Sequence, residues 1–143
     1  MSIVWSASFA TGSPEVDRQH QELIRQIGAL SNAMKAGKGR DELKRMLDFL
    51  GQYVVQHFRD EERVMEQFAC PAAARNKQEH AKFLALFQQL NRKFESGEAQ
   101  VSVLLEIHDT VTEWLLRHIK GVDLQLAQTI RQAQQAPVGA GAK

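Results

Sequence analysis

The chain has 143 residues, of which 43% are hydrophobic and 24% are charged, a composition typical of one soluble globular domain with a single core. Its 18 basic and 17 acidic residues give a net charge of +1, so neither nucleic acid nor an anionic membrane surface is indicated as a partner. The single cysteine, Cys70, excludes an intrachain disulfide, and no secretory signal or membrane span is recognised. We therefore expect a cytoplasmic protein.

Two amphipathic helices are predicted in the first half of the chain. The first runs from about Pro14 to Ala36, with Ser13 as its N-cap and Pro14 in its first turn. Its apolar residues recur every three or four positions, at Val16, Leu23, Ile24, Ile27, Leu30 and Met34. The segment 37–39 ends this helix, and the second begins near Asp41, with an apolar stripe at Leu43, Leu47, Leu50, Val54, Phe58, Met65 and Phe68.

Two further helices are predicted in the second half. Cys70-Pro71 marks the break before the third, which ends near Gly97 and has its stripe at Ala73, Phe83, Leu84, Phe87, Leu90 and Phe94. The fourth runs from about Val101 through Leu104, Leu105, Val111, Leu115 and Ile119, and a break or bend is expected at Gly121. Because the connecting loops are short, the pattern predicts an all-α fold, an up-down-up-down antiparallel four-helix bundle.

The chain divides into three parts. Residues 1–12 form an N-terminal arm, whose Trp5 and Phe9 are expected to pack across the bundle, and residues 13–125 form the bundle itself. Residues 126–143 form a C-terminal extension, and its end, from about Gln134, has the composition of a disordered tail or a linker.

Metal-ligand side chains fall on the stripe of every predicted helix. They are His20, His57, Glu61, His80, His118 and, just after the fourth helix, Asp123. In an antiparallel bundle all six project toward the same end. A buried imidazole or carboxylate costs several kcal/mol unless it is paired or binds a metal, so one metal centre explains the whole set. Nitrogen and oxygen ligands without thiolate favour non-haem iron or manganese over structural zinc, and six ligands suit two ions.

The order and spacing of these residues resemble those of the bacterial hemerythrins over roughly residues 3–125. The resemblance is carried by Trp5, Asp17-Arg18-Gln19-His20, Tyr53-Val54-Val55-Gln56-His57-Phe58, Glu61-Glu62, Met65, His80, Phe83, Trp114-Leu115-Leu116-Arg117-His118-Ile119 and Asp123. It implies a four-helix bundle that holds two iron ions, bridged by an oxo or hydroxo group, and that binds O2 reversibly for its carriage, storage or delivery.

The resemblance also implies roles, position by position. One iron would be held by His20 and His57 and the other by His80 and His118, with Glu61 and Asp123 bridging them. Exclusion of water from the O2 pocket slows oxidation of the irons, and the residues that would shield this pocket are Phe58, Trp114, Leu115 and Ile119.

One position departs from the family pattern. The family usually has a second histidine one helical turn before the position of His80, and here that residue is Asn76. An amide oxygen can coordinate a hard cation, but it is a weaker ligand to iron than imidazole. The iron held by His80 and His118 would then carry water, the Asn76 oxygen or a substituted carboxylate.

Two other functions stay open. A sensor of O2 or redox state would pass its signal to a protein partner through the C-terminal extension, where Leu124, Leu126 and Ile130 could extend a helix. A di-iron oxidase or peroxidase would use an open coordination position at Asn76. The sequence shows no acid, base or substrate-binding cluster beyond the ligands, so an enzyme is the less favoured interpretation.

Other polar residues near the stripes are interpreted as structural. His108 lies ten residues before His118, about 15 Å along the helix, and cannot reach the same metal pair. We expect Tyr53 and Cys70 to pack rather than react. Solvation or surface ion pairs are expected for Glu62, Glu66 and Glu113.

Overall fold

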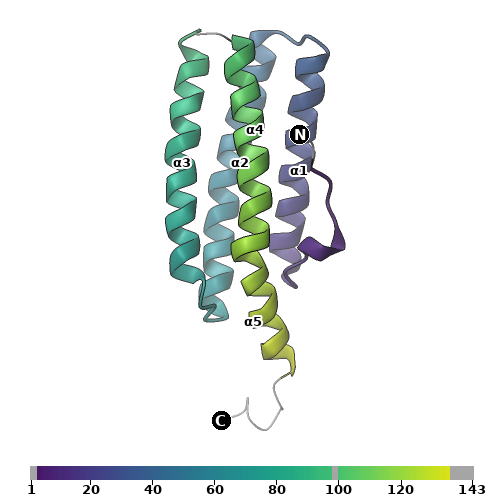
Figure 1. The fold of residues 1–143 in the computed structure, drawn as a ribbon, viewed down its shortest axis with the longest axis vertical. Helices are drawn as coiled ribbons and strands as arrows, with labels where there is room; N and C mark the ends of the chain where they lie inside the picture. The colour runs from purple at the N-terminus through teal and green to yellow at the C-terminus, as the bar shows by residue number, and fades with distance from the viewer. Residues whose placement is uncertain (1–2, 98–99, 136–143) are drawn as a thin grey trace.

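Four long helices run antiparallel to one another along most of the length of the molecule (Figure 1). The structure is a computed structural model, and it describes residues 3–97 and 100–135. The long helices are α1 (Pro14–Lys35), α2 (Arg40–Gln67), α3 (Ala73–Glu95) and α4 (Gln100–His118). Each packs against the next in the chain, and α1 also packs against α4, which closes the bundle. The predicted all-α, four-helix architecture is confirmed, with no strand in the described residues.

The ends of the helices follow the local signals in the sequence. The Ser13 side chain caps α1 by accepting a hydrogen bond from the backbone N–H of Val16 at 3.3 Å. Gly37 and Gly97 adopt φ of +70° and +85° directly after α1 and α3, a conformation that glycine reaches without steric cost. After α2 the same left-handed conformation is taken by Ala69, with φ of +52°. The predicted breaks at these three places are confirmed.

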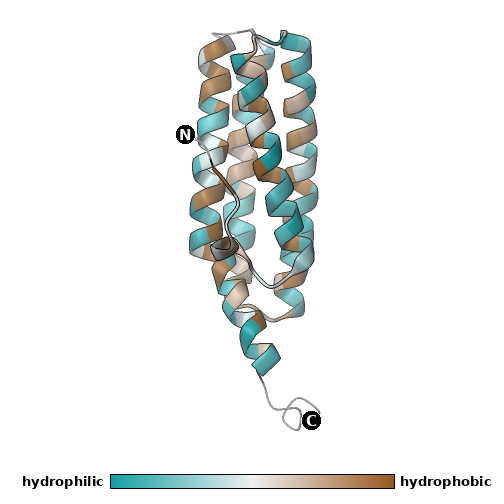
Figure 2. Ribbon diagram, turned by 90° about the vertical axis from the view of Figure 1, so that its right-hand side faces the viewer, coloured by the Kyte–Doolittle hydropathy of each residue, from teal (hydrophilic) through white to brown (hydrophobic). Residues whose placement is uncertain are grey.

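Apolar residues form two separate clusters along the bundle axis. The larger cluster fills most of the bundle and draws on all four long helices. The smaller cluster lies at the end where the chain leaves the bundle, and its members are Val16, Val64, Met65, Cys70, Ala72, Val122, Leu126 and Ile130. Figure 2 shows hydrophobic and hydrophilic residues alternating along each helix, as expected when one face of each is buried.

Residues 3–12 of the N-terminal arm lie against the bundle, as predicted (Figures 1 and 2). It contains one short turn of 3-10 helix, η1 (Ala7–Phe9). Phe9 is buried in the larger cluster, and Trp5 is partly buried against the same cluster with its ring edge-on to Phe9 at 5.9 Å between centroids.

The fourth helix does not break at Gly121, where the sequence predicts a break or bend. It continues through a π-helical turn, η2 (Ile119–Asp123), into a further helix, α5 (Leu124–Gln135). A π turn holds one more residue per turn than an α-helix and keeps the backbone hydrogen-bonded, so no break is needed.

The first part of the C-terminal extension belongs to the folded unit. Leu126 and Ile130 are buried in the smaller cluster, so their side chains are covered by this chain and are not free for a partner. Gln134 and Gln135 are the last residues of α5. The disordered tail that we predict beyond them, residues 136–143, lies outside the described residues. No helix in the described ranges is long and apolar enough to cross a membrane.

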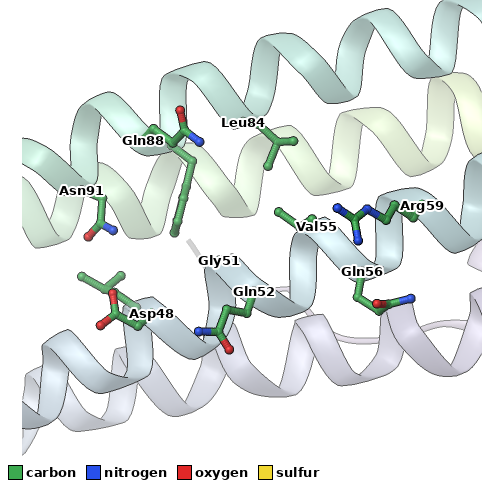
Figure 3. Close-up of a pocket in the computed structure, with 11 residues that line it drawn as sticks. Asp48, Gly51, Gln52, Val55, Gln56, Arg59, Leu84, Gln88 and Asn91 are labelled. Carbon is green, nitrogen blue, oxygen red and sulfur yellow. The ribbon is translucent and has the colours of Figure 1, made fainter.

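A surface groove of about 480 Å³ runs between α2 and α3 (Figure 3). The two helices approach closely at the floor of the groove, where Gly51 faces the Phe87 ring. A Cβ added at Gly51 would lie only 3.0 Å from that ring. Polar side chains such as Gln52, Gln88 and Asn91 line the groove, and none of the predicted metal ligands does. The predicted chemistry therefore lies elsewhere, inside the bundle.

Candidate metal centre

The six predicted ligands converge in one polar layer inside the bundle. They come from all four long helices and η2, and each is at most 3% exposed: His20, His57, Glu61, His80, His118 and Asp123. The layer lies between the two apolar clusters, since its members alternate along the helices with residues of both. Convergence at one end of the bundle is thus what the structure shows.

The first half-site consists of His20 from α1 and His57 from α2. His20 Nε2 lies 3.1 Å from Glu61 Oε2 and 3.2 Å from Asp123 Oδ2. His57 Nε2 lies 3.4 Å from the same oxygen of Glu61. Ligand atoms of His20, His57 and Glu61 all lie within 4.8 Å of one another, close enough to hold one metal ion.

The second half-site consists of His80 from α3 and His118 from α4. It faces the other oxygen of each carboxylate: His80 Nε2 lies 3.0 Å from Glu61 Oε1, and His118 Nε2 lies 3.2 Å from Asp123 Oδ1 and 3.7 Å from Glu61 Oε1. Ligand atoms of His80, His118 and Glu61 also form a group that could hold a metal ion. Glu61 and Asp123 therefore each offer one oxygen to each half-site, which is the arrangement of bridging carboxylates.

The π turn explains how His118 and Asp123 can serve the same centre. Residues five apart in a regular α-helix point about 140° away from each other, because each residue turns the helix by roughly 100°. A turn with i to i+5 periodicity brings such residues back onto one face. The π-helical segment begins directly after His118 and ends at Asp123. Local irregularity in the backbone is thus what positions the second carboxylate.

Three of the four histidines have an outer partner on the ring nitrogen that points away from the centre. His57 Nδ1 lies 2.7 Å from Gln19 Oε1, His80 Nδ1 lies 2.8 Å from Glu62 Oε2, and His118 Nδ1 lies 2.9 Å from Glu79 Oε1. Such partners accept the Nδ1 hydrogen, orient the ring and leave Nε2 free for a metal.

Our sequence interpretation missed these outer partners. We expected Glu62 in solvent or in a surface ion pair, and that was wrong, because its carboxylate binds His80 across the α2–α3 interface. Each partner is the immediate sequence neighbour of a ligand and serves a histidine on the next helix: Gln19 precedes His20, Glu62 follows Glu61, and Glu79 precedes His80. Adjacency to a ligand is the signal that could have found them.

The two carboxylates make the layer favourable for positive charge. Burial acts to lower the pKa of His20 and of His118, but their polar contacts with Asp123 and Glu61 outweigh it and raise each pKa to about 10. For Glu61, burial acts to raise the pKa, but the surrounding histidines hold it well below its ordinary value. The pKa of His57 is instead lowered, because burial dominates.

Buried polar atoms in the layer that lack a well-directed hydrogen bond indicate that it is built around cations. Six such atoms lie there in the described part of the chain: His20 Nδ1, Glu61 Oε1, Asn76 Nδ2, His80 Nε2, Asp123 Oδ1 and Asp123 Oδ2. Four of them have only an ion-pair contact at 3.0 to 3.2 Å. Buried polar atoms without partners are costly and rare in native proteins. Four of these atoms are electron-pair donors on predicted ligands that face the centre, and a metal ion would satisfy them. Imidazole and carboxylate ligands without thiolate suit iron, so the residues fit the iron pair that we predict.

An apolar roof covers the layer on the side of the larger cluster. The Phe58 ring stacks on His80 at 3.7 Å between centroids, and the Trp114 ring stacks on His118 at 4.4 Å. A small cavity lies just above them, and its lining is entirely hydrophobic: Leu23, Ile27, Val54, Phe58, Phe83, Val111, Trp114 and Leu115. Three of the four residues predicted for the O2 pocket thus line this cavity, whereas Ile119 is fully buried in the surrounding core.

Comparison with known proteins agrees with this geometry. Residues 11–130 match the Hemerythrin HHE cation binding domain. The chain belongs to the hemerythrin family. A bacteriohemerythrin of Methylococcus capsulatus is 34% identical over 125 residues, which cover 85% of this chain and 91% of that protein. A hemerythrin-like protein of Naegleria gruberi is 32% identical over 122 residues, covering 85% of this chain and 87% of that protein.

Solved structures of hemerythrin share the fold. A wild-type hemerythrin crystal structure superposes with a TM-score of 0.76 at 32% identity, covering 90% of this chain and 97% of that one. A hemerythrin variant in which one leucine is replaced by tyrosine gives a TM-score of 0.77 at 31% identity, covering 90% of this chain and 96% of that one. Family membership and fold are therefore established together.

Apart from Glu62, the residues that we interpreted as structural lie outside the layer. His108 is buried with its Nδ1 3.1 Å from Asp109 Oδ1, and it belongs to neither metal-binding group among the described residues. Glu66 pairs with Lys77 at 3.0 Å on the surface, as expected for a solvated carboxylate. Cys70 is buried in the smaller cluster and Tyr53 packs against the larger one.

Proposed function

We propose that this hemerythrin-family chain holds two iron ions and binds O2 reversibly, for carriage, storage or delivery of O2. One observation carries the proposal. Glu61 and Asp123 each face the first half-site with one carboxylate oxygen and the second half-site with the other. Two imidazoles on each side complete a symmetric set of nitrogen and oxygen donors. When bound, an iron pair supplies the electrons that reversible binding of O2 requires.

The protein's own residues prepare this site in three ways. The outer partners of His57, His80 and His118 fix the hydrogen on Nδ1 and so direct each Nε2 toward the centre. Metal binding displaces the protons that His20 and His118 hold through the carboxylates, since both histidines must be neutral to act as ligands. Burial of all six ligands between two apolar clusters keeps water away from them.

The apolar cavity supports O2 as the small molecule that the site accepts. Its lining has no polar surface, and every long helix contributes a residue to it, such as Leu23 one turn beyond His20 and Val54 one turn before His57. A dry apolar space favours an uncharged diatomic molecule over water or anions. The rings of Phe58 and Trp114 line this space and stack on His80 and His118, which keeps water from these ligands and slows irreversible oxidation.

Anaerobic reconstitution with ferrous iron tests the proposal. We expect two iron ions per chain, and a visible absorption band that appears when O2 is admitted and disappears when O2 is removed, over repeated cycles. His108→Gln provides a matched control, because it changes a buried histidine that lies outside the layer. Oxidation of the iron in one step, with no band that follows O2, would contradict reversible binding.

A further inference from the structure

Asn76 occupies a ligand-like position in the second half-site. It lies in the first turn of α3, four residues before His80, and is fully buried. Residues four apart share a face of a helix, so the Asn76 and His80 side chains enter the layer together. The same spacing relates His57 and Glu61 on α2.

The Asn76 oxygen points at the centre. Asn76 Oδ1 lies 2.7 Å from His118 Nε2, while His118 Nδ1 faces the Glu79 carboxylate at 2.9 Å. A carboxylate only accepts hydrogen bonds, so Nδ1 carries the hydrogen and a neutral His118 presents an electron pair at Nε2. Two electron-pair donors this close need a positive centre beside them. A proton on Nε2 can supply it, and so can a metal ion.

The amide nitrogen of Asn76 has nothing to bind. Asn76 Nδ2 is buried and has no hydrogen-bond partner among the described residues. If the amide were turned over, Nδ2 would donate to His118 Nε2 and occupy the electron pair that a metal needs. The two orientations of the amide therefore give Asn76 opposite roles. With Oδ1 toward the centre Asn76 is a metal ligand, and with Nδ2 toward the centre it blocks the half-site.

We infer that the side-chain oxygen of Asn76 is a fifth protein ligand of the second half-site, which leaves the open coordination positions mainly at the half-site of His20 and His57. The second half-site then has donors from His80, His118, Asn76 and one oxygen each of Glu61 and Asp123, whereas no described residue gives the first half-site an equivalent of Asn76. The inference rests on the proposed metal pair. It gives the two metals unequal coordination without a third histidine.

Metal binding by Asn76→Leu tests the inference, because leucine has nearly the same shape and cannot coordinate. Ferrous iron is titrated anaerobically by calorimetry into the full chain, and bound iron is measured after gel filtration. We expect the wild type to bind two ions and Asn76→Leu to bind its second ion at least tenfold more weakly. The matched control is Asn91→Leu, which removes a partly buried amide from the same helix at the surface groove (Figure 3) and should bind like the wild type.

A second variant keeps the test decisive if Asn76→Leu folds poorly. Asn76→Asp retains an oxygen at the same place and adds charge, so we expect the second ion to bind more tightly than in the wild type. Unchanged affinity in both variants, or tighter binding in Asn76→Leu, would overturn the inference while leaving the proposed O2 binding intact. A wild type that binds one ion or none would overturn the inference and the proposed iron pair together.

Discussion

The two half-sites share their carboxylates but differ in the hydrogen-bond partners of their histidines on Nδ1. In the second half-site both histidines have carboxylate partners on Nδ1, Glu62 and Glu79, which are partly exposed. In the first, His57 has a neutral amide partner, Gln19, and His20 Nδ1 has none among the described residues. Carboxylate partners make an imidazole a stronger electron donor than amide partners do.

This difference suggests a division of labour between the two metal positions. The carboxylate partners of His80 and His118, together with the Asn76 oxygen, favour firm retention of a metal in the second half-site. The first half-site has fewer donors, and the one outer partner of its histidines, Gln19, is uncharged. A metal held in this way suits the position where an external molecule binds. A layer that is symmetric in its main ligands is therefore asymmetric in its surroundings.

Removal of the shared carboxylate should have the largest effect, because it acts on both half-sites. Glu61→Leu deprives each metal of a ligand and leaves the inner nitrogens of His57 and His80 without a carboxylate, whereas His20 and His118 keep Asp123. We expect bound iron to fall below one ion per chain, as measured after anaerobic reconstitution. Glu66→Leu is the control on the same helix, since Glu66 is exposed and pairs only with Lys77 among the described residues. Retention of two ions in Glu61→Leu would exclude a bridging role.

Changing one histidine should separate the two half-sites. We expect His57→Leu to lose the metal of the first half-site and to keep about one iron per chain, because the donors of the second half-site remain. O2-dependent absorption should disappear although iron is still bound. If His57→Leu and His80→Leu had the same residual iron content and the same residual affinity, the two positions would be equivalent and the comparison would fail.

The metal-free protein should lose stability as pH rises. His20 and His118 have folded-state pKa values of about 10 against 6.5 for an ordinary histidine, so the folded state binds more protons between these values. Their contribution is complete below pH 6.5 and is lost toward pH 10. Since one pKa unit corresponds to ~1.4 kcal/mol, we expect Tm of the chelator-treated protein to fall by at least ~3 °C over this window.

The metal-loaded protein provides the control for this pH series. Its His20 and His118 are neutral ligands at every pH where the metal stays bound, so its Tm should change much less over the same window. Parallel melting curves with and without chelator, recorded by circular dichroism, make the measurement. A metal-free protein that gained stability with rising pH would contradict the protonation that we assign to these histidines.

Replacement of an outer partner should have the smallest effect. Glu79→Gln keeps the contact to His118 Nδ1 but removes its charge, so we expect roughly tenfold weaker binding at the second half-site and no change at the first. Gln19→Leu removes the acceptor of the His57 Nδ1 hydrogen and should weaken the first half-site without changing the second. Calorimetric titration of both variants checks these signs. Equal effects at the two half-sites would show that the outer partners do not act locally.

The helices and the convergence of the candidate ligands could be predicted from local pattern alone. Apolar residues at three- and four-residue intervals, the Ser13 cap and the glycine stops determine where helices begin and end, and an antiparallel order then sends His20, His57, His80 and His118 to one end. Nothing in this reasoning needs a contact between distant residues. The predicted helix ends and the shared end of the four histidines therefore do not depend on the details of side-chain packing.

Only the tertiary structure decided how the ligands are held. The outer partners act between helices, and a carboxylate such as Glu62 looks solvated until the neighbouring helix brings His80 within 2.8 Å. The π turn after His118 was predicted as a break or bend, because a glycine does not reveal whether the backbone breaks or takes in one extra residue. The direction of the Asn76 amide depends on the position of His118, 42 residues away, and no local pattern encodes it.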